Sequence, residues 1–292
     1  MKNNDIFNFR RFGRYFASDI RTCTANYGLS LATISLLILG ALYICTVAIS
    51  LIFNGTWQGP GIGFRMTAFM VAMLCIVVTM PAKCYGRLTE KQYGSEWLMV
   101  PASGLEKFLS MLIITLIIGP VIGIVLFLGL DAIICALDAT CGQNLTAFFT
   151  RAMSTLNTLL DEGVTSDGIV LPTQGVVFIK NIMDPWLWID ELPMTILPFV
   201  LGAICFKNGK TVKTILVIMA AGMITSIAMS PVMMEWVSQI PVLASENPAE
   251  ALERLDEISF FRNIKLTDTI SDTITNIALI AGIWFRIKTM KH

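Results

Sequence analysis

Residues 29–53 form an apolar stretch of 25 residues without one charged side chain. A helix of about 20 residues crosses the ~30 Å hydrocarbon core of a bilayer, where the chain must satisfy its own backbone hydrogen bonds. Five further stretches are candidates of the same kind. The six expected spans are residues 29–53, 66–82, 108–130, 192–206, 214–234 and 270–285.

The composition is also typical of a membrane protein. The chain of 292 residues is 55% apolar and only 14% charged, whereas a soluble domain carries about 25% charged residues. We therefore expect an all-α fold class, with one polytopic transmembrane domain of six helices covering residues 1–292. The sixth span is the weakest candidate, because Asp272 and Asn276 dilute its outer half.

Charged residues alternate between the segments that separate the spans. Of the 21 Lys and Arg residues, 15 lie in the first, third, fifth and seventh segments, together with only 5 of the 21 acidic residues. Flanking Lys and Arg resist translocation, so these segments are expected in the cytoplasm with both termini. Arg65, at the outer end of the second span, is expected to extend toward the membrane surface. The expected location is a bacterial inner membrane.

Residues 1–28 are expected to form a cytoplasmic interfacial segment. Apolar side chains recur at a spacing that a helix can gather near one face, and arginines can meet anionic lipid headgroups. The apolar set is Phe7, Phe9, Phe12, Tyr15, Phe16 and Ile20, and the basic set is Arg10, Arg11, Arg14 and Arg21. The alternative is an unstructured basic tail.

The cytoplasmic segment 83–107 is the most patterned polar stretch. Ser103 and Glu106 match a capping box, in which each side chain accepts a hydrogen bond from the other residue's backbone amide. The third span is therefore expected to begin near Gly104. Upstream, residues 85–97 are expected to form a short surface helix, which completes a compact helix-turn-helix facing the cytoplasm.

The two large outer segments, residues 131–191 and 235–269, are expected to be short acidic caps, too small for a separate core. The first includes an amphipathic helical stretch at 145–160. Cys135 and Cys141 are the cysteines placed where an oxidising compartment could join them. Two interpretations stay open for this pair, a disulfide or two small buried residues at a helix end.

Gly119 and Pro120 stand in the middle of the third span and are followed by Gly123. Proline removes a backbone donor and bends a helix, while Gly119 and Gly123 form a small-xxx-small face on which another helix can pack closely. Two interpretations stay open here too. One is a hinge or substrate-path kink, and the other is ordinary close packing.

The residue types needed for enzymatic or ion-coupled chemistry are scarce. The single histidine is His292, which excludes histidine-based zinc sites and nucleophile-histidine pairs. The first five spans carry no ionisable residue in their central parts, where ion-coupled carriers need one. The residues around Lys210 end like a phosphate-binding loop, but Ile204 replaces the required glycine. We expect no catalytic site, metal, cofactor or nucleic-acid partner.

The segment GSEWLMVPASGLEKFLSMLI, residues 94–113, resembles a signature of uncharacterised bacterial inner-membrane proteins, which has the form LMxPASxxEKFxS. The opening residues FNFRRFGRYFASDI are similar to the start of those proteins. Val100 replaces their usual leucine, and Met111 stands where a basic residue often follows Ser110. The likeness covers about the first 130 residues in specific motifs and the remainder only in its six-span pattern.

That group is similar in layout to type 2 ABC transporter permeases, in which a separate ATPase docks between the second and third spans. The resemblance implies a permease-like subunit of an ABC-type exporter, as a homodimer or paired with a related permease. Residues 85–107 would dock the ATPase, and the candidate contacts are Glu90, Lys91, Glu96, Trp97, Ser103 and Glu106. The alternative is a non-transporting membrane scaffold or assembly factor of the cell envelope.

Overall fold

The structure is a computed structural model that describes residues 7–90, 94, 97, 99–151, 154, 185–244 and 259–289. Within these ranges every element of secondary structure is a helix. The first long helix comprises α1 (Phe9–Cys23), the π-helical segment η1 (Thr24–Gly28) and α2 (Leu29–Asn54). The second is α3 (Ile62–Cys84), followed by the 3-10 turn η2 (Gly86–Thr89).

The third long helix is also built from three pieces. They are α5 (Gly104–Ile113), the π-helical segment η3 (Ile114–Ile118) and α6 (Gly119–Leu137), followed by the short 3-10 helix η4 (Ala139–Cys141). The remaining long helices are α9 (Pro185–Cys205), α10 (Lys210–Ala244) and α12 (Ser259–Thr289).

Four helices are long and apolar enough to cross a membrane, namely Phe9–Asn54, Ile62–Cys84, Gly104–Leu137 and Lys210–Ile227. A shorter apolar helix covers Leu192–Cys205. The expectation of an all-helical protein with several candidate membrane spans is therefore confirmed for the described residues. The sixth expected span falls on α12, which is not among the four candidates found in the described residues.

The helices extend beyond the expected spans. The second span was expected at 66–82, but α3 begins at Ile62, and α6 runs on to Leu137. Similarly, α10 continues to Ala244 and α12 begins at Ser259. Parts of the expected outer segments 131–191 and 235–269 are therefore helical extensions of the spans. The rest of those segments lies largely outside the described residues.

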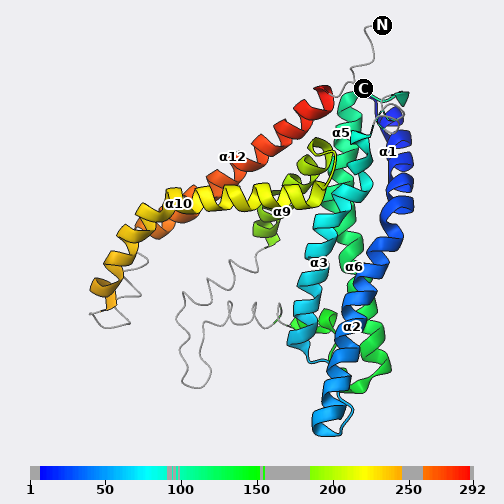
Figure 1. Ribbon diagram of the computed structural model, residues 1–292, viewed down its shortest axis with the longest axis vertical. Helices are drawn as coiled ribbons and strands as arrows, with labels where there is room; N and C mark the ends of the chain where they lie inside the picture. Colours follow the sequence, from blue (N-terminus) through cyan, green and yellow to red (C-terminus); the bar gives the residue numbers. More distant parts are fainter. Residues whose placement is uncertain are drawn as a thin grey trace.

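Three long helices form an elongated bundle, in which α2, α3 and α6 run side by side (Figure 1). α10 begins beside the bundle and runs at a wide angle to it, and α10 and α12 extend away from it (Figure 1). The beginnings of α1 and α5 and the end of α12 lie at one end of the molecule, which is called the upper end below. α9 lies at the junction, where it contacts α3, α10 and α12.

The N-terminal segment is helical from Phe9, as expected, and it continues directly into the first span. α1 continues through η1 into α2, so that residues 9–54 form one helix of 46 residues. At 1.5 Å per residue this helix is about 70 Å long, more than twice the hydrocarbon thickness. α1 therefore extends the first span beyond the membrane core. One face of α1 packs on α5 and α3.

The core consists of two apolar clusters. The upper cluster surrounds α9, where Leu197, Val200 and Ile204 are fully buried. The apolar part of α9, Leu192–Cys205, therefore packs largely against other helices of the protein. The lower cluster lies between α2, α3 and α6 and centres on Phe127, whose ring contacts Phe69 with centroids 5.4 Å apart.

The contact between α9 and α10 depends on a glycine. A Cβ built on Gly202 would lie 1.8 Å from Oγ1 and 2.8 Å from Cβ of Thr214, and rotating the Thr214 side chain cannot remove the second clash. We expect Gly202→Ala to lower the free energy of unfolding by about 1–3 kcal/mol through overpacking. Thermal unfolding in detergent micelles, followed by circular dichroism, measures this loss.

The matched control is Gly222→Ala in α10, where an added Cβ meets nothing within 4 Å. Because alanine is the better helix former by up to about 1 kcal/mol, this change should be neutral or stabilising. Equal losses in the two variants would contradict the packing of α9 on α10 described above.

Candidate functional site

The segment between α3 and α5, residues 85–103, is called the connecting segment. α3 ends at Cys84, and Tyr85 leads into the 3-10 turn η2. The surface helix expected over 85–97 does not begin there. Residues 86–89 form the tighter 3-10 turn, which Glu90 follows. Lys91 and Glu96 lie outside the described residues.

The expected capping box is present at the start of α5. Ser103 Oγ accepts a hydrogen bond from the Glu106 backbone amide at 3.2 Å, and Glu106 Oε2 accepts one from the Ser103 amide at 2.9 Å. Two of the amides that a helix start leaves unpaired are thereby satisfied. The third long helix therefore begins at Gly104, as the sequence predicts.

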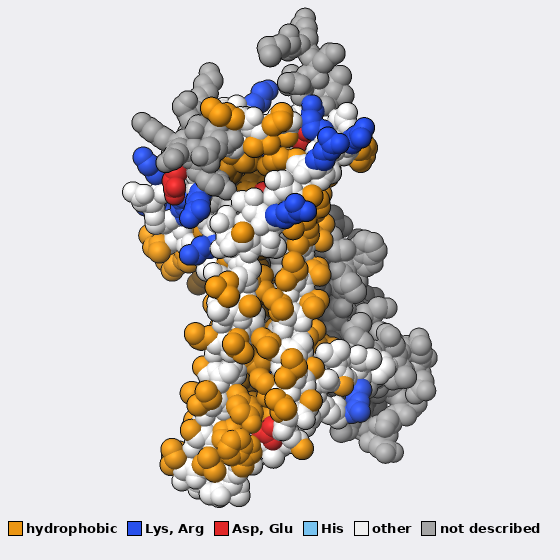
Figure 2. Space-filling model, turned by 90° about the vertical axis from the view of Figure 1, so that its right-hand side faces the viewer, with side chains coloured by type: hydrophobic (Ala, Val, Ile, Leu, Met, Phe, Trp, Pro, Cys, Tyr) orange, Lys and Arg blue, Asp and Glu red, His pale blue; other side chains and the backbone are white. Residues whose placement is uncertain are grey.

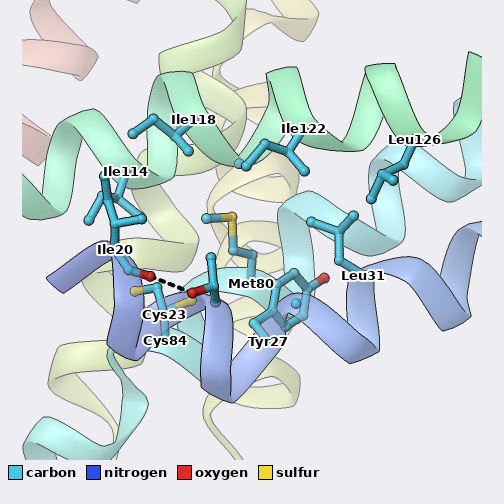
Figure 3. Close-up of a pocket in the computed structure, with 13 residues that line it drawn as sticks. Ile20, Cys23, Tyr27, Leu31, Met80, Cys84, Ile114, Ile118, Ile122 and Leu126 are labelled. Carbon is cyan, nitrogen blue, oxygen red and sulfur yellow. Dashed lines mark hydrogen bonds between the residues drawn. The ribbon is translucent and has the colours of Figure 1, made fainter. Parts of the chain in front are cut away.

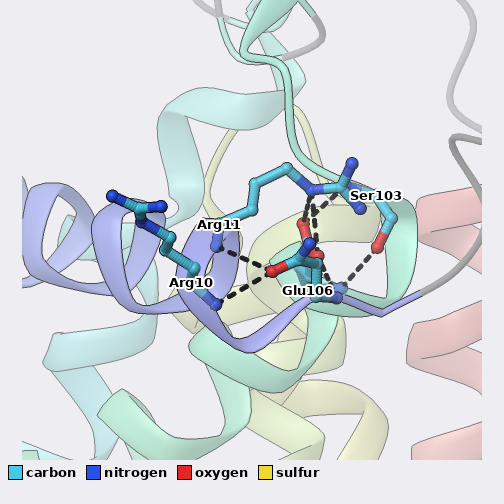
Figure 4. A network of polar contacts seen from close by, with 5 residues as sticks. Arg10, Arg11, Ser103 and Glu106 are labelled. Carbon is cyan, nitrogen blue, oxygen red and sulfur yellow. Dashed lines mark hydrogen bonds and ion pairs between the residues drawn. The ribbon is translucent and has the colours of Figure 1, made fainter.

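Glu106 also joins α5 to α1. Arg11 Nε donates to both carboxylate oxygens at 3.0 and 2.8 Å, and the Asn8 backbone amide donates to Oε1 at 3.0 Å (Figure 4). The Glu106 side chain is fully buried, whereas that of Arg11 is 29% exposed. The spacing of Ser103 and Glu106 predicts the cap, but no local pattern predicts the ion pair, because Arg11 lies 95 residues away.

A second junction centres on Asp19 in α1. Its Oδ2 accepts hydrogen bonds from the Tyr85 hydroxyl at 3.0 Å and the Ser110 hydroxyl at 2.5 Å. One carboxylate therefore joins α1, the connecting segment and α5. In the sequence, Asp19 is distinguished only as one of two acidic residues, with Asp5, in the basic segment 1–28.

Trp97 is held between α1 and α5. Its indole Nε1 donates to the Tyr15 hydroxyl at 3.0 Å, and Lys107 Nζ donates to its carbonyl at 2.7 Å while lying 4.7 Å from the centre of its ring. Lys210, at the start of α10, donates to the Gly86 carbonyl. The connecting segment is therefore bonded to three of the long helices. Glu90 is exposed and accessible to a partner.

The expected kink falls at the end of a π-helical segment. η3 covers Ile114–Ile118 and stops at Gly119-Pro120. Because the ring of Pro120 conflicts with the carbonyl four residues earlier, ordinary α-helical bonding cannot continue there, and a wider turn relieves the conflict. A Cβ on Gly119 would lie 2.1 Å from Met80 Sδ, and one on Gly123 would lie 3.1 Å from Ile76. The close packing of both glycines on α3 is thus observed.

A small apolar pocket separates the two π-helical segments (Figure 3). Thr24, Tyr27 and Gly28 of η1 face Ile114 and Ile118 of η3 across a cavity of about 70 Å³. The Tyr27 hydroxyl also bonds that of Thr79 on α3 at 2.7 Å. Regular α-helical bonding is interrupted on both sides of this pocket. Because π-helical segments often accompany functional sites, the pocket is a candidate site.

Arg65 differs from the expectation that it extends toward the membrane surface. Its side chain is fully buried, and Nη1 lies 2.9 Å from Asp131 Oδ1. The guanidinium also donates to the carbonyls of Cys141 and Gln143 at 2.9 and 2.6 Å, while Asp131 Oδ2 accepts the Leu145 amide at 2.7 Å. The physical reason is the length of the helices: with α3 starting at Ile62 and α6 reaching Leu137, both charges lie inside the bundle.

The lower end of α6 is fixed by Asp138. Its carboxylate accepts hydrogen bonds from the Thr140 hydroxyl and amide, the Tyr43 hydroxyl and the Trp57 indole, and these bonds hold its pKa well below the usual range. Cys135 and Cys141 are free thiols beside this site, and Cys141 is buried. The structure thus has two small thiols packed at a helix end rather than a disulfide.

The two roles of Glu106 can be separated by mutation. Glu106→Gln keeps the capping box, which accepts glutamine, but removes the charge that pairs with Arg11. We expect it to lower the free energy of unfolding by about 1.5–3 kcal/mol, the range for a hydrogen bond to a charged group. Ser103→Ala removes only the cap and should cost about 1 kcal/mol. Chemical unfolding of the purified protein compares them; a neutral Glu106→Gln would contradict the ion pair.

The position of Arg65 is tested in the same way. Because Arg65→Gln leaves Asp131 as an unpaired buried charge, we expect a loss of about 3–5 kcal/mol in the free energy of unfolding. Lys83→Gln is the matched control, since Lys83 is an exposed cation on the same helix, and it should change stability little. A small effect of Arg65→Gln, like that of the control, would mean that Arg65 reaches water as the sequence suggested.

Comparisons with protein-family models, with curated proteins and with solved structures find no match to this chain. The functional interpretation therefore rests on the residues and contacts described above.

Proposed function

We propose that this chain is the membrane-spanning, permease-like subunit of an exporter that is driven by a separate ATPase. It would cross a bacterial inner membrane six times, with both termini in the cytoplasm, and would act as a homodimer or with a related permease. The observation that carries the proposal is the connecting segment, which is exposed at Glu90 and bonded to α1, α5 and α10.

The charges at the upper end support this orientation. Basic side chains gather at that end of the molecule, above a broad hydrophobic surface (Figure 2). They come from α1, from the end of α3 and from the start of α10, all of which are segments that the positive-inside rule assigns to the cytoplasm. The upper end is therefore the side on which a cytoplasmic ATPase would dock.

The bonding pattern supports coupling between a docked partner and the spans. A displacement of the connecting segment would move α1 through Tyr85 and Trp97 and would move α10 through Gly86. Below these contacts, η1 and η3 interrupt regular helical bonding on both sides of the apolar pocket. These segments provide the place where the spans would bend, which favours the hinge interpretation of Gly119 and Pro120 alongside their close packing.

A membrane scaffold is the second candidate, and α10 favours it. This helix extends from the bundle and exposes several large apolar side chains on its first half, among them Val212, Leu216 and Met223. Such a surface suits another membrane helix, in a paired permease or in a larger assembly. The experiment below distinguishes the two candidates.

The docking proposal is tested by purifying the tagged full chain from its native host in mild detergent and identifying an ATPase among the proteins that accompany it. Reversing the acidic charges by Glu90→Lys and Glu96→Lys should remove at least 90% of that ATPase, because a docking surface depends on charge complementarity. The thermal stability of the variant is measured alongside, because Glu90 attracts Lys210, which donates to the Gly86 carbonyl. Loss of the ATPase at unchanged thermal stability shows that docking, and not folding, has been removed.

Asp161→Lys is the matched control, a charge reversal in an outer segment that should leave the ATPase bound. The permease proposal is overturned if no ATPase accompanies the purified wild-type chain and the double variant is as active in its host as the wild type. Crosslinks from residues 161–167 to another envelope protein would then identify the chain as a scaffold.

A further inference from the structure

A second cavity lies at the upper end, between α1 and the end of the connecting segment. It has a volume of about 550 Å³, and its lining is mainly polar on α1 and apolar on the connecting segment. The residues that line it are Asn8, Arg10, Arg11, Arg14, Tyr15, Ser18, Val100, Pro101 and Ala102. This cavity is called the arginine pocket. It is formed by residues other than those of the apolar pocket.

The three arginines of the pocket differ in their partners. Arg11 is paired with Glu106 and contributes little net charge. Arg10 and Arg14 are exposed, and no acidic side chain among the described residues pairs with either. They lie four residues apart, so they are neighbours on one face of α1 and repel each other. An anion bound between the two guanidinium groups would relieve this repulsion.

The surroundings of the pocket are apolar. Phe9 and Met99 are more than 80% exposed, and Val100 in the pocket wall is 39% exposed. The basic side chains at this end lie directly above the hydrophobic surface of the bundle (Figure 2). A ligand that fills the pocket would therefore meet cationic and hydrophobic groups together, a combination that suits an amphiphile better than a free anion.

We propose that the arginine pocket binds the phosphate group of an anionic phospholipid. Arg10 and Arg14 donate to the phosphate oxygens, for which the planar guanidinium fork is well matched. The Ser18 hydroxyl lies one further turn along the same face and lines the same cavity. The acyl chains lie against the exposed apolar side chains beside the pocket, Phe9, Met99 and Val100. Nothing in this site depends on an ATPase, so the inference stands apart from the proposed function.

The test uses the full chain, delipidated in detergent and titrated with phosphatidylglycerol, with phosphatidylcholine or with inorganic phosphate. Lipid binding is read from native mass spectra and from the rise in the melting temperature. We expect phosphatidylglycerol to bind and stabilise the wild-type protein and phosphatidylcholine to do so far less. In Arg10→Gln/Arg14→Gln, half-saturation should need about tenfold more phosphatidylglycerol or more, from the loss of charge-assisted hydrogen bonds.

Arg21→Gln is the matched control, because Arg21 is an exposed arginine of α1 that does not line the pocket. It should bind phosphatidylglycerol as the wild type does. Arg10→Lys/Arg14→Lys keeps the charge but loses the guanidinium fork, so an intermediate affinity supports phosphate recognition. The double glutamine variant should melt as the wild type does in phosphatidylcholine, which shows that it has folded.

Three results would overturn the proposal. If Arg21→Gln weakens binding as much as the double variant, the lipid responds only to the overall charge of α1. If inorganic phosphate alone gives the full stabilisation, the site takes a free anion. If the double glutamine variant retains phosphatidylglycerol but loses a co-purifying protein, the pocket is a protein-docking surface.

Discussion

Two buried carboxylates hold this helical bundle together, one toward each end. Glu106 pairs with Arg11 and accepts the backbone amides of Asn8 and Ser103, while Asp131 pairs with Arg65 and accepts the amide of Leu145. A buried carboxylate is costly unless charge and hydrogen bonds compensate it. Each acid is therefore compensated by an arginine from a different helix and by at least one backbone amide. This requirement helps to fix which helices are adjacent, because apolar packing by itself is not directional.

Between these two sites the bundle is less regular. The π-helical segments η1 and η3 lie on opposite sides of the small apolar pocket, and Pro120 explains why the second is needed. The helices are thus tied by directional polar bonds toward both ends and by non-directional apolar packing in between. If the spans bend as the proposed function requires, η1 and η3 are the segments where regular α-helical bonding is already interrupted.

Several features could be predicted because they depend on neighbours in the chain. The capping box needs only Ser103 and Glu106, three residues apart, and the long uncharged stretches identify helices by length alone. Gly119 and Gly123 share a helix face by their spacing, so close packing could be foreseen, although Met80 and Ile76 as their partners could not. The connecting segment was identified as patterned, but Lys91 and Glu96 fall outside the described residues, so the expected docking contacts remain a prediction.

The amino-acid sequence by itself determined that the chain is helical, that it carries several apolar helices long enough to cross a membrane, and where α5 begins, because hydropathy and capping act within one helix. The tertiary structure alone decided the roles of Arg65, Asp19 and Arg11. Each meets its partner across 66 to 95 residues of chain. Arg65 would precede α3 if the helix began at residue 66, but α3 begins at Ile62, and Arg65 lies within the helix and is buried. Burial is a property of how helices pack together, and a side chain's pattern along its own helix does not reveal it.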